Sequence, residues 1–361
     1  TGLVTMLVAA MIALFKDDLK GLLAYSTVSH LGLVTMLFGF GTPLAAMAGV
    51  FHILNHASFK AALFMNAGII DHEAGTRDIR RLGGLLQLMP MTATIAMVAA
   101  AAMAGLPPLN GFISKEMMLQ EAVGTAWLGA DGLVPALATL AACFSVAYSF
   151  RYIVHVFFGP RRDDYPHTPH DPPAGMWLPP ALLVVLAVLI GLFPDVVAGP
   201  LVTVVSGAVT GGAAPDVHLA LWHGFTPALA LSAVAVLVGL VALAAYPRVR
   251  ALWRAGPHPE AKAMFDAGIA GAVALSGRII HGLHNGSLQR YLAFAIGSVT
   301  AAGFAAFLAA PHAPGTRELL PLAPVAVVAW LLLVGGCVLA VALYRQRLLS
   351  LLVVGMVGLI V

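Results

Sequence analysis

Residues 322–344 read LAPVAVVAWLLLVGGCVLAVALY, an apolar run without one charged side chain. An α-helix needs about 20 apolar residues to cross the ~30 Å hydrocarbon core of a membrane. The run is too long for the roughly ten-residue alternating strands of a membrane β-barrel. It therefore predicts a membrane-spanning helix.

The same kind of run recurs along the whole chain. Further runs cover residues 1–15, 19–40, 43–70, 89–123, 133–158, 177–193, 225–246, 291–310 and 348 onward. Sixty per cent of the residues are apolar and 10% are charged, a balance that excludes an ordinary soluble globular protein. We expect an all-α, polytopic transmembrane helix bundle with about ten spans.

Lysine and arginine gather in alternate connections between these runs. They occur at residues 16–20, 77–81, 161–162 and 248–254, but not at residue 41 or within 124–132 and 194–224. Basic connections face the cytoplasm as a rule, so we place the first set inside. The small positive net charge then reports membrane orientation and not a nucleic-acid partner.

Residues 258–290 interrupt the apolar pattern. Lys262, Arg278 and His281 are among the polar residues spread through this segment. Such a pattern is typical of an amphipathic helix that lies along a membrane surface. Placing the helix laterally on the cytoplasmic face keeps Arg345 and Arg347 inside and leaves only Arg317 outside.

Ionisable side chains occupy the centre of the third run, where residues 51–60 read FHILNHASFK. His52, His56 and Lys60 follow at four-residue steps, each about 6 Å along the helix and about 40° around it. The groups share one face, too far apart for direct bonds but close enough for bridging water. Because charge at membrane depth is costly and marks ion pathways, the row predicts a proton relay.

Two other interpretations of the histidines stay open. They can simply bond neighbouring helices in a packed core. The His-x3-His pair is also a zinc-ligand spacing, although no acid or cysteine nearby completes a ligand shell.

The fourth run contains helix-breaking residues, since residues 103–116 read MAGLPPLNGFISKE. Gly105, Pro107, Pro108 and Gly111 predict a break in the helix at membrane depth. Broken backbone there is tolerated only where it lines protein or a wet cavity, as at transporter ion sites. Lys115 follows the break, either as a functional amine or as a snorkelling side chain with Glu116 as ion-pair partner.

Weaker candidates lie in the second run and in the connection after the third. His30 is either a helix-packing hydrogen-bonder or part of the relay. Lys20 is either a positive-inside anchor or a proton uptake group. Residues 71–81 are most simply a solvated loop, whose acids are candidates for collecting protons or cations.

The chain shows no motif for redox or phosphate chemistry. It contains no phosphate-binding glycine loop, nucleophile elbow, haem site or iron–sulfur cysteine spacing. We expect that the chain binds no cofactor and is not an enzyme. We predict a transporter that is driven by a gradient or by partner subunits.

Three motifs together carry a family resemblance. LAYSTVS at residues 23–29, His52-x3-His56-x2-Phe59-Lys60 and GFISKE at residues 111–116 resemble the antiporter-like subunits shared by respiratory complex I and Mrp-type cation/proton antiporters. The resemblance covers residues 1–193. Residues 69–81, IIDHEAGTRDIRR, are more similar to the A subunit of Mrp sodium/proton antiporters than to the large complex I subunit.

The resemblance implies roles for the candidate residues. Lys60 is then the central lysine, Lys115 the lysine of the broken helix, and His52 and His56 the relay between them. It implies transport of H⁺ and Na⁺, with other subunits of a hetero-oligomeric Mrp complex and membrane lipid as partners, no nucleic acid, and a bacterial inner membrane as location.

The resemblance also implies a division of the chain. Residues 1–193 are the second half of the antiporter-like core, 194–257 an outer loop and a further transmembrane helix, 258–290 the lateral helix, and 291–361 transmembrane helices that lead into an extension. In the family these motifs fall in the second of two inverted five-helix repeats, and an acid and a lysine of the first repeat would precede Thr1. Because both ends of the sequence lie within apolar runs, we expect a natural polypeptide longer at both ends.

Three other functions stay open. A redox-driven pump subunit of complex I type would use the same relay, powered by electron transfer in other subunits. A membrane scaffold without transport would keep the helices but not need the lysines. A soluble enzyme would require stable expression without detergent.

Overall fold

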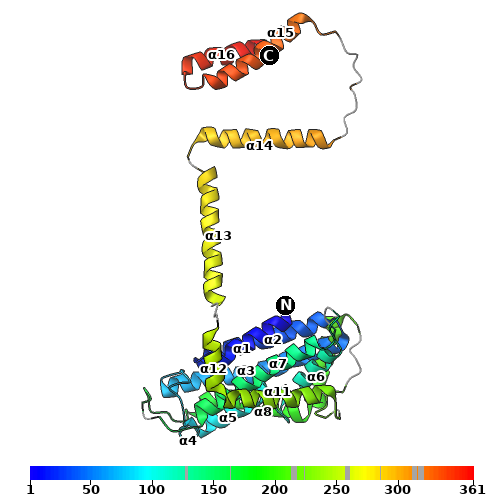
Figure 1. The fold of residues 1–361 in the computed structure, drawn as a ribbon, viewed down its shortest axis with the longest axis vertical. Helices are drawn as coiled ribbons and strands as arrows, with labels where there is room; N and C mark the ends of the chain where they lie inside the picture. The colour runs from blue at the N-terminus through cyan, green and yellow to red at the C-terminus, as the bar shows by residue number, and fades with distance from the viewer. Residues whose placement is uncertain are drawn as a thin grey trace. The chain divides into compact units, whose positions relative to one another are not determined.

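A computed structural model describes residues 1–126, 129–162, 164–212, 218–222, 224–256, 261–284, 286–310, 315 and 321–361, with the backbone alone for 261 and 262. Every secondary-structure element named in these residues is an α-helix, as predicted (Figure 1). Contacts divide the chain into two units, Thr1–His258 and Pro259–Val361. Of the sequence-based expectations, those for residues 258–260, residue 285 and Arg317 lie outside the described residues.

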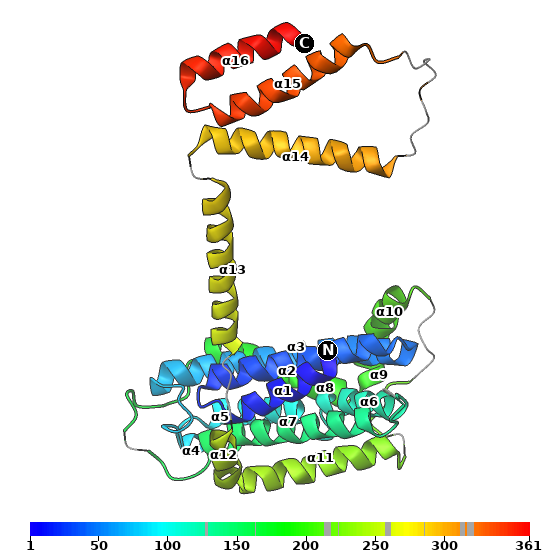
Figure 2. The ribbon, with the colours of Figure 1, turned by 45° about the horizontal axis from the view of Figure 1, so that its top comes forward.

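The first unit is a bundle of long helices joined by short ones (Figure 2). The long helices are α1 Gly2–Phe15, α2 Leu19–Phe40, α3 Pro43–Ala74, α5 Pro90–Ala104, α6 Asn110–Val123, α7 Leu133–Phe157, α8 Ala174–Leu192 and α11 Pro227–Ala244. The shorter helices are α4 Leu85–Leu88, α9 Pro194–Val197, α10 Gly199–Thr210 and α12 Tyr246–Ala255.

Local signals set the ends of α2 and α3. The Asp18 carboxylate accepts a hydrogen bond from the Gly21 amide at 2.6 Å and caps the start of α2. Gly41 ends α2 in the left-handed conformation. Thr42 then caps α3 by accepting from the Ala45 amide at 3.0 Å. This two-residue corner, Gly41 and Thr42, fixes α2 and α3 as neighbours, and both helices carry candidate site residues.

Glycines allow two pairs of helices to pack backbone against backbone. A Cβ atom on Gly32 of α2 would lie 2.5 Å from the Met6 amide nitrogen of α1. One on Gly111 of α6 would lie 1.8 Å from the Ala102 carbonyl oxygen of α5. Close approach through small residues is the usual way for membrane helices to associate. It holds the two halves of the broken helix against each other.

The predicted spans are all helical. In the part of the chain that the structure describes, seven helices are long and apolar enough to cross a membrane: Leu19–Phe40, Leu133–Phe157, Ala174–Leu192, Pro227–Ala244, Ala263–Leu283, Leu288–Ala309 and Pro324–Ala342. Polar residues near its centre keep α3 below that hydropathy despite its 32 residues. The run 89–123 is interrupted, with Gly105 left-handed at φ 82° between α5 and α6, which confirms the discontinuous helix.

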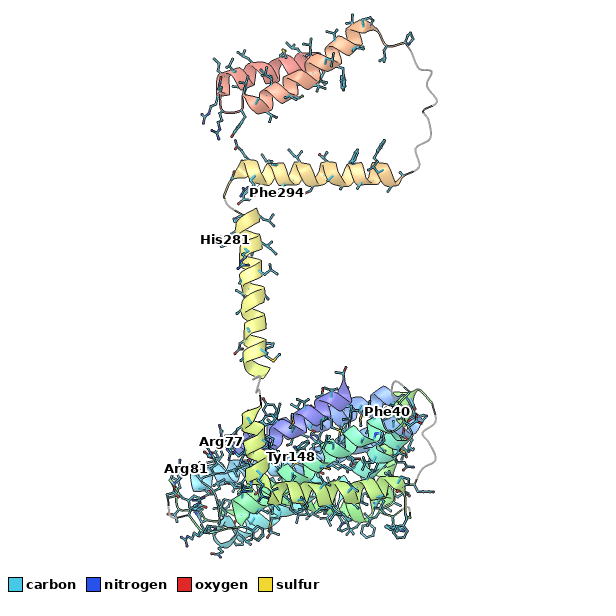
Figure 3. All side chains as sticks on the ribbon, viewed as in Figure 1. Phe40, Arg77, Arg81, Tyr148, His281 and Phe294 are labelled. Atoms are coloured by element: carbon cyan, nitrogen blue, oxygen red, sulfur yellow. The ribbon has the colours of Figure 1, made fainter. Side chains whose placement is uncertain are left out.

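The basic connections meet at one end of the first unit. Figure 3 shows Arg77 and Arg81 at that end and Phe40 at the other. The Lys20 amine donates to Asp71 at 2.9 Å, and Arg162 donates to the Arg80 carbonyl at 3.4 Å. Helices that each cross once bring alternate connections to the same side, so the alternation of charge has a structural counterpart.

The prediction of a solvated loop at residues 71–81 is wrong for the first residues of this segment. Helix α3 continues to Ala74 and ends at the left-handed Gly75. Glu73 is 6% exposed, and its carboxylate pairs with His72 at 3.0 Å and His170 at 3.4 Å. His170 comes from the distant 164–173 segment, and no local sequence pattern indicates that it covers Glu73.

The second unit contains α13 Ala261–Leu283, α14 Leu288–Ala309, α15 Pro324–Ala342 and α16 Arg347–Ile360. Helices α15 and α16 pack together. In the described chain, α14 and α16 bury no residue and α15 buries only Gly336. By length and composition Ala263–Leu283 also qualifies as a span, so the lateral placement of α13 stays a prediction.

Candidate functional site

Lys60 lies near the middle of α3 with its amine directed at α2. The side chain is 4% exposed. Its amine donates to the Ser26 hydroxyl and to the Leu23 carbonyl, the latter at 3.4 Å. No described ion pair includes Lys60, so its amine has neutral acceptors and no fixed counter-charge that holds it in one protonation state.

A histidine pair joins α2 to α3. His30 Nδ1 lies 2.9 Å from His52 Nε2, and the two rings are nearly parallel with centroids 5.1 Å apart. The other nitrogen of His52, Nδ1, lies 2.9 Å from the Ser114 hydroxyl of α6. His30 Nε2 in turn lies 3.2 Å from the Tyr148 hydroxyl of α7. Since each ring uses both nitrogens, the pair links four helices through groups that can donate and accept protons.

His56 shares a face with His52 but not its hydrogen bonds. Its ring centroid lies 6.2 Å from that of His52 and 5.2 Å from that of His30. Its Nε2 atom is buried and has no hydrogen-bond partner in the part of the chain that the structure describes. The four-residue spacing therefore groups the rings, as expected, without bonding them directly.

The helix break gives Lys115 its partners. Its amine donates to the carbonyls of Met103 at 2.8 Å and Ala104 at 3.0 Å, and to the Ser145 hydroxyl at 2.8 Å. The last carbonyls of an α-helix have no partner within the helix and carry partial negative charge. Lys115 on α6 satisfies those at the end of α5, and no described ion pair joins it to Glu116.

The other end of α5 is capped from a distant segment. The Asp171 carboxylate accepts from the amides of Met91 at 2.9 Å and Thr92 at 3.0 Å. The Thr92 hydroxyl adds a bond at 2.8 Å. An acid at the N-terminus and a lysine at the C-terminus both match the dipole of this short helix.

Ser145 and Tyr148 of α7 belong to the site, and the sequence analysis missed them. The Ser145 hydroxyl donates to the Tyr148 hydroxyl at 3.0 Å, and Tyr148 lies 3.2 Å from His30 Nε2. Figure 3 shows Tyr148 within the first unit. The signal was available, because the two residues are three apart and share a face of an apolar helix. Hydroxyls are common in such helices, however, and nothing local marks these two.

An amide cluster fixes α3 against the start of α6. Asn55 donates to the Asn110 carbonyl at 3.1 Å, and the Asn110 amide donates to Ser58 at 3.0 Å. All three residues are buried. The cluster sets the register that brings Ser114, one turn further along α6, to His52.

Lys20 lies outside this network. Its side chain is 40% exposed and pairs with Asp71 at the end of the unit where the basic connections meet. At the same end, the hydrogen bond from Arg80 lowers the pKa of the Asp78 carboxyl. The structure thus brings together Lys60, Lys115, His30, His52 and His56, and places Lys20 at the edge.

Asp17 forms an ion-pair cluster that the sequence did not indicate. Its carboxylate binds the guanidinium groups of Arg151 at 2.6 Å and Arg250 at 2.5 Å. Arg151 is 1% exposed and also donates to the carbonyls of Leu14 and Lys16. The partners are 134 and 233 residues from Asp17. The cluster ties α7 and α12 to the end of α1, and no described hydrogen bond or ion pair joins it to Lys60 or Lys115.

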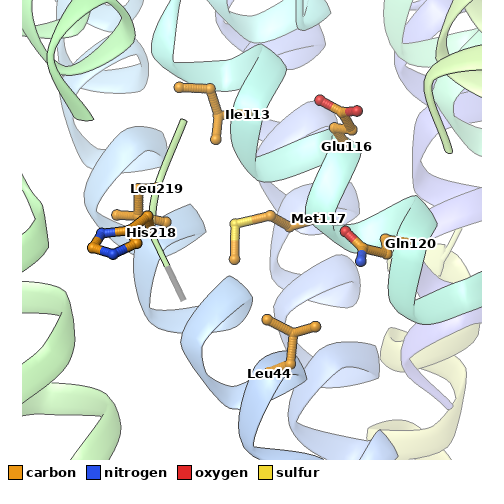
Figure 4. Close-up of a pocket in the computed structure, with 7 residues that line it drawn as sticks. All are labelled: Leu44, Ile113, Glu116, Met117, Gln120, His218 and Leu219. Carbon is orange, nitrogen blue, oxygen red and sulfur yellow. The ribbon is translucent and has the colours of Figure 1, made fainter. Parts of the chain in front are cut away.

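A cavity of about 120 Å³ lies beside α6 (Figure 4). It is lined by Leu44, Ile113, Glu116, Met117, Gln120, His218 and Leu219. Glu116 is 5% exposed and accepts a bond from the Thr226 hydroxyl at 3.3 Å. The cavity faces a different side of α6 from the Lys115 amine, and no described hydrogen bond links the two.

Known proteins resemble the chain over the region that carries the site. The family model "NADH:quinone oxidoreductase/Mrp antiporter, TM" matches residues 1–140. The chain is 53% identical, over 66% of its length and 24% of the relative's, to a Rhizobium meliloti protein named as the A/B subunit of a probable K⁺/H⁺ antiporter. It is 32% identical to the A subunit of the Na⁺/H⁺ antiporter of Alkalihalophilus pseudofirmus, over 99% of the chain and 48% of the relative.

A solved structure is similar over the same extent. A chain of the Mrp complex from Dietzia sp. matches with a TM-score of 0.72 and 33% identity, covering 99% of this chain and 38% of that one. This chain therefore spans between about a quarter and a half of the proteins it matches. These matches confirm the resemblance to antiporter-like subunits and the prediction of a multi-pass membrane protein.

Proposed function

We propose that the chain moves protons in a multisubunit monovalent cation/proton antiporter, starting from the match of residues 1–140 to the transmembrane family model of NADH:quinone oxidoreductase and Mrp antiporters. The observation that carries the proposal is a pair of buried lysines, Lys60 and Lys115, whose partners among the described residues are hydroxyls and carbonyls. Ionisable groups kept at membrane depth mark ion pathways.

Protons pass along a hydrated axis formed by these lysines and the histidines between them. Desolvation disfavours a charged amine, whereas a nearby charge or a bridging water changes that balance. Each lysine therefore alternates between its protonated and neutral forms as its neighbours change. Lys20, at the edge where the basic connections meet, takes up protons for His30, and His56 assists through water.

The cation that moves against the protons is Na⁺ in this proposal. The relative from Alkalihalophilus pseudofirmus is named for Na⁺. The Rhizobium meliloti relative is named for K⁺ and is 53% identical. That name makes K⁺ the second candidate, and both cations belong in one assay.

The proposal includes partners and location. The similar Dietzia chain is part of a complex, and the relatives are named as subunits. We infer that this chain assembles with further subunits in a bacterial inner membrane and contacts lipid. Residues 1–193 then form the second half of the antiporter-like core, residues 194–257 the outer loop and a further span, residues 258–290 the lateral helix, and residues 291–361 spans that lead into an extension.

Everted membrane vesicles test the proposal directly. They should contain the full-length protein with its partner subunits, be energised, and receive Na⁺ or K⁺ while the pH gradient is followed. In the wild type we expect the added cation to collapse the pH gradient. In Lys60→Ala and Lys115→Ala the rate of collapse should fall at least about 100-fold, a size typical of removing a proton-transfer group.

Lys16→Ala is the matched control, because Lys16 lies over the Tyr25 ring at 4.8 Å and joins no buried hydrogen bond of the site. It should retain the rate. Unchanged collapse in both buried-lysine variants would move the ion path to a partner and leave this chain a scaffold. Proton uptake that requires an electron donor, and no added cation, would favour a redox-driven pump.

A further inference from the structure

We propose that the hydroxyls of Ser145 and Tyr148 carry protons between Lys115 and the His30–His52 pair. The inference rests on the proposed function and names two residues that no sequence pattern assigned to it. It also names a route, since Lys115 and the histidines lie on different helices.

The contacts form one unbroken series. From the Lys115 amine the hydrogen bonds run to Ser145 Oγ at 2.8 Å, to the Tyr148 hydroxyl at 3.0 Å and to His30 Nε2 at 3.2 Å. They continue from His30 Nδ1 to His52 Nε2 at 2.9 Å. Each distance lies within or close to the normal range for a hydrogen bond. No water is needed to close this series.

The series can be polarised in one direction. Lys115 donates to Ser145 and Ser145 donates to Tyr148. With Tyr148 donating to His30 Nε2, the Nδ1–H of His30 is free to donate to His52 Nε2. Every group then donates to the next, the arrangement that a stepwise proton transfer requires.

The proton balance of one transfer is simple. Protonated Lys115 gives up one proton and becomes neutral. Ser145 and Tyr148 each accept one proton and release another, and His30 accepts at Nε2 while it releases from Nδ1. His52 accepts at Nε2, keeps its proton on Nδ1 and becomes an imidazolium. One positive charge moves from α6 to α3, and no other species is produced or consumed.

Burial alone does not explain these bonds. Tyr152 lies one turn along the same helix and is equally buried, yet its hydroxyl has no hydrogen-bond partner among the described residues. Ser149 donates to the Ser145 carbonyl of its own helix at 2.7 Å. Helix α7 thus contains tyrosine and serine residues that serve packing, beside two whose hydroxyls bridge separate helices.

These neighbours supply the experiment. In the vesicle assay with the full-length protein and its partner subunits, Tyr148→Phe should lower the antiport rate at least about tenfold, because the ring remains but the bridging hydroxyl is lost. Tyr152→Phe should retain the rate. Ser145→Ala should fall with Tyr148→Phe, and Ser149→Ala should not.

Two readouts separate this inference from a folding defect and from the proposed function. The amount of protein in the membrane and its recovery with partner subunits should be equal for all four variants. If Lys60→Ala and Lys115→Ala are inactive while Tyr148→Phe transports as fast as Tyr152→Phe, the route is wrong and the lysine axis stands. Equal loss in Tyr148→Phe and Tyr152→Phe would also overturn the route, because it would assign the effect to packing.

Discussion

The centre of α3 and the break between α5 and α6 each hold one buried lysine, but they bind it in different ways. Lys60 sits on a continuous helix and depends on one hydroxyl, Ser26, and one long bond to Leu23. Lys115 sits beside a helix end and has two carbonyls and a hydroxyl within 3.0 Å.

The difference shows what a break in a membrane helix contributes. A continuous helix uses its carbonyls internally, so a buried amine must find acceptors on other helices. A helix that ends within the bundle exposes its last carbonyls and the negative end of its dipole. The break also orients Lys115 toward Ser145, which joins it to the histidine pair, whereas Lys60 has no described hydrogen bond to that pair.

Filling the space at the helix break should have the largest effect on transport. Gly105 has φ 82°, and a Cβ atom there would lie 2.7 Å from Lys115 Cδ. We expect Gly105→Ala to displace the lysine from the α5 carbonyls and to lower the antiport rate at least about tenfold, with backbone strain of about 1–2 kcal/mol. Vesicle transport measures the first effect and thermal unfolding of the purified complex the second.

Gly68→Ala is the control, since a Cβ atom on this α3 glycine meets nothing within 4 Å. It should match the wild type in rate and stability. A Gly105→Ala variant as active as Gly68→Ala would mean that the carbonyl contacts of Lys115 do not matter for transport.

A smaller effect is expected from removing the hydroxyl that binds Lys60. Ser26→Ala removes the only side-chain acceptor described for the amine, while the Leu23 carbonyl remains. The net contribution of one hydrogen bond, about 0.5–1.5 kcal/mol, corresponds to a several-fold fall in rate, less than Lys60→Ala causes. Initial rates over a range of external pH would show the change.

Thr27→Ala is the matched control for Ser26→Ala. The Thr27 hydroxyl donates to the Leu23 carbonyl of its own helix at 2.9 Å and does not bind Lys60. A rate that falls equally in both variants would indicate a defect in α2 and not in the lysine site.

The smallest effect is expected at the far end of α5. Asp171→Ala removes the cap on Met91 and Thr92 and should cost about 1 kcal/mol in stability. Because the Lys115 contacts are untouched, transport at moderate temperature should change less than about twofold. A large loss of rate at full assembly would show that both ends of α5 act on the site.

The sequence predicted much of this site because its strongest signals are local. The spacing of His52, His56 and Lys60 and the Gly-Pro pattern before Lys115 are each contained in a few residues. They correctly placed ionisable groups on one helix and a discontinuity in the next.

The remaining features depend on how distant helices meet. The bond between His30 and His52 needs the register of α2 against α3, and Tyr148 reaches His30 across 118 residues of sequence. Asp17 pairs with Arg250 across 233 residues. No periodicity within a helix specifies its neighbour, so the sequence could not choose the hydroxyls on α7 or the partners of Asp17.

The carbonyls that bind Lys115 have a consequence for how the protein tolerates change. Met103 and Ala104 contribute main-chain oxygens, which are the same whatever side chain is attached to those residues. Evolution can therefore alter both positions, within the limits of packing, without erasing the acceptors. The residues that cannot change are instead Gly105, which shapes the backbone, and Lys115, which carries the charge. A search for polar side chains therefore does not detect the part of the site that peptide groups supply.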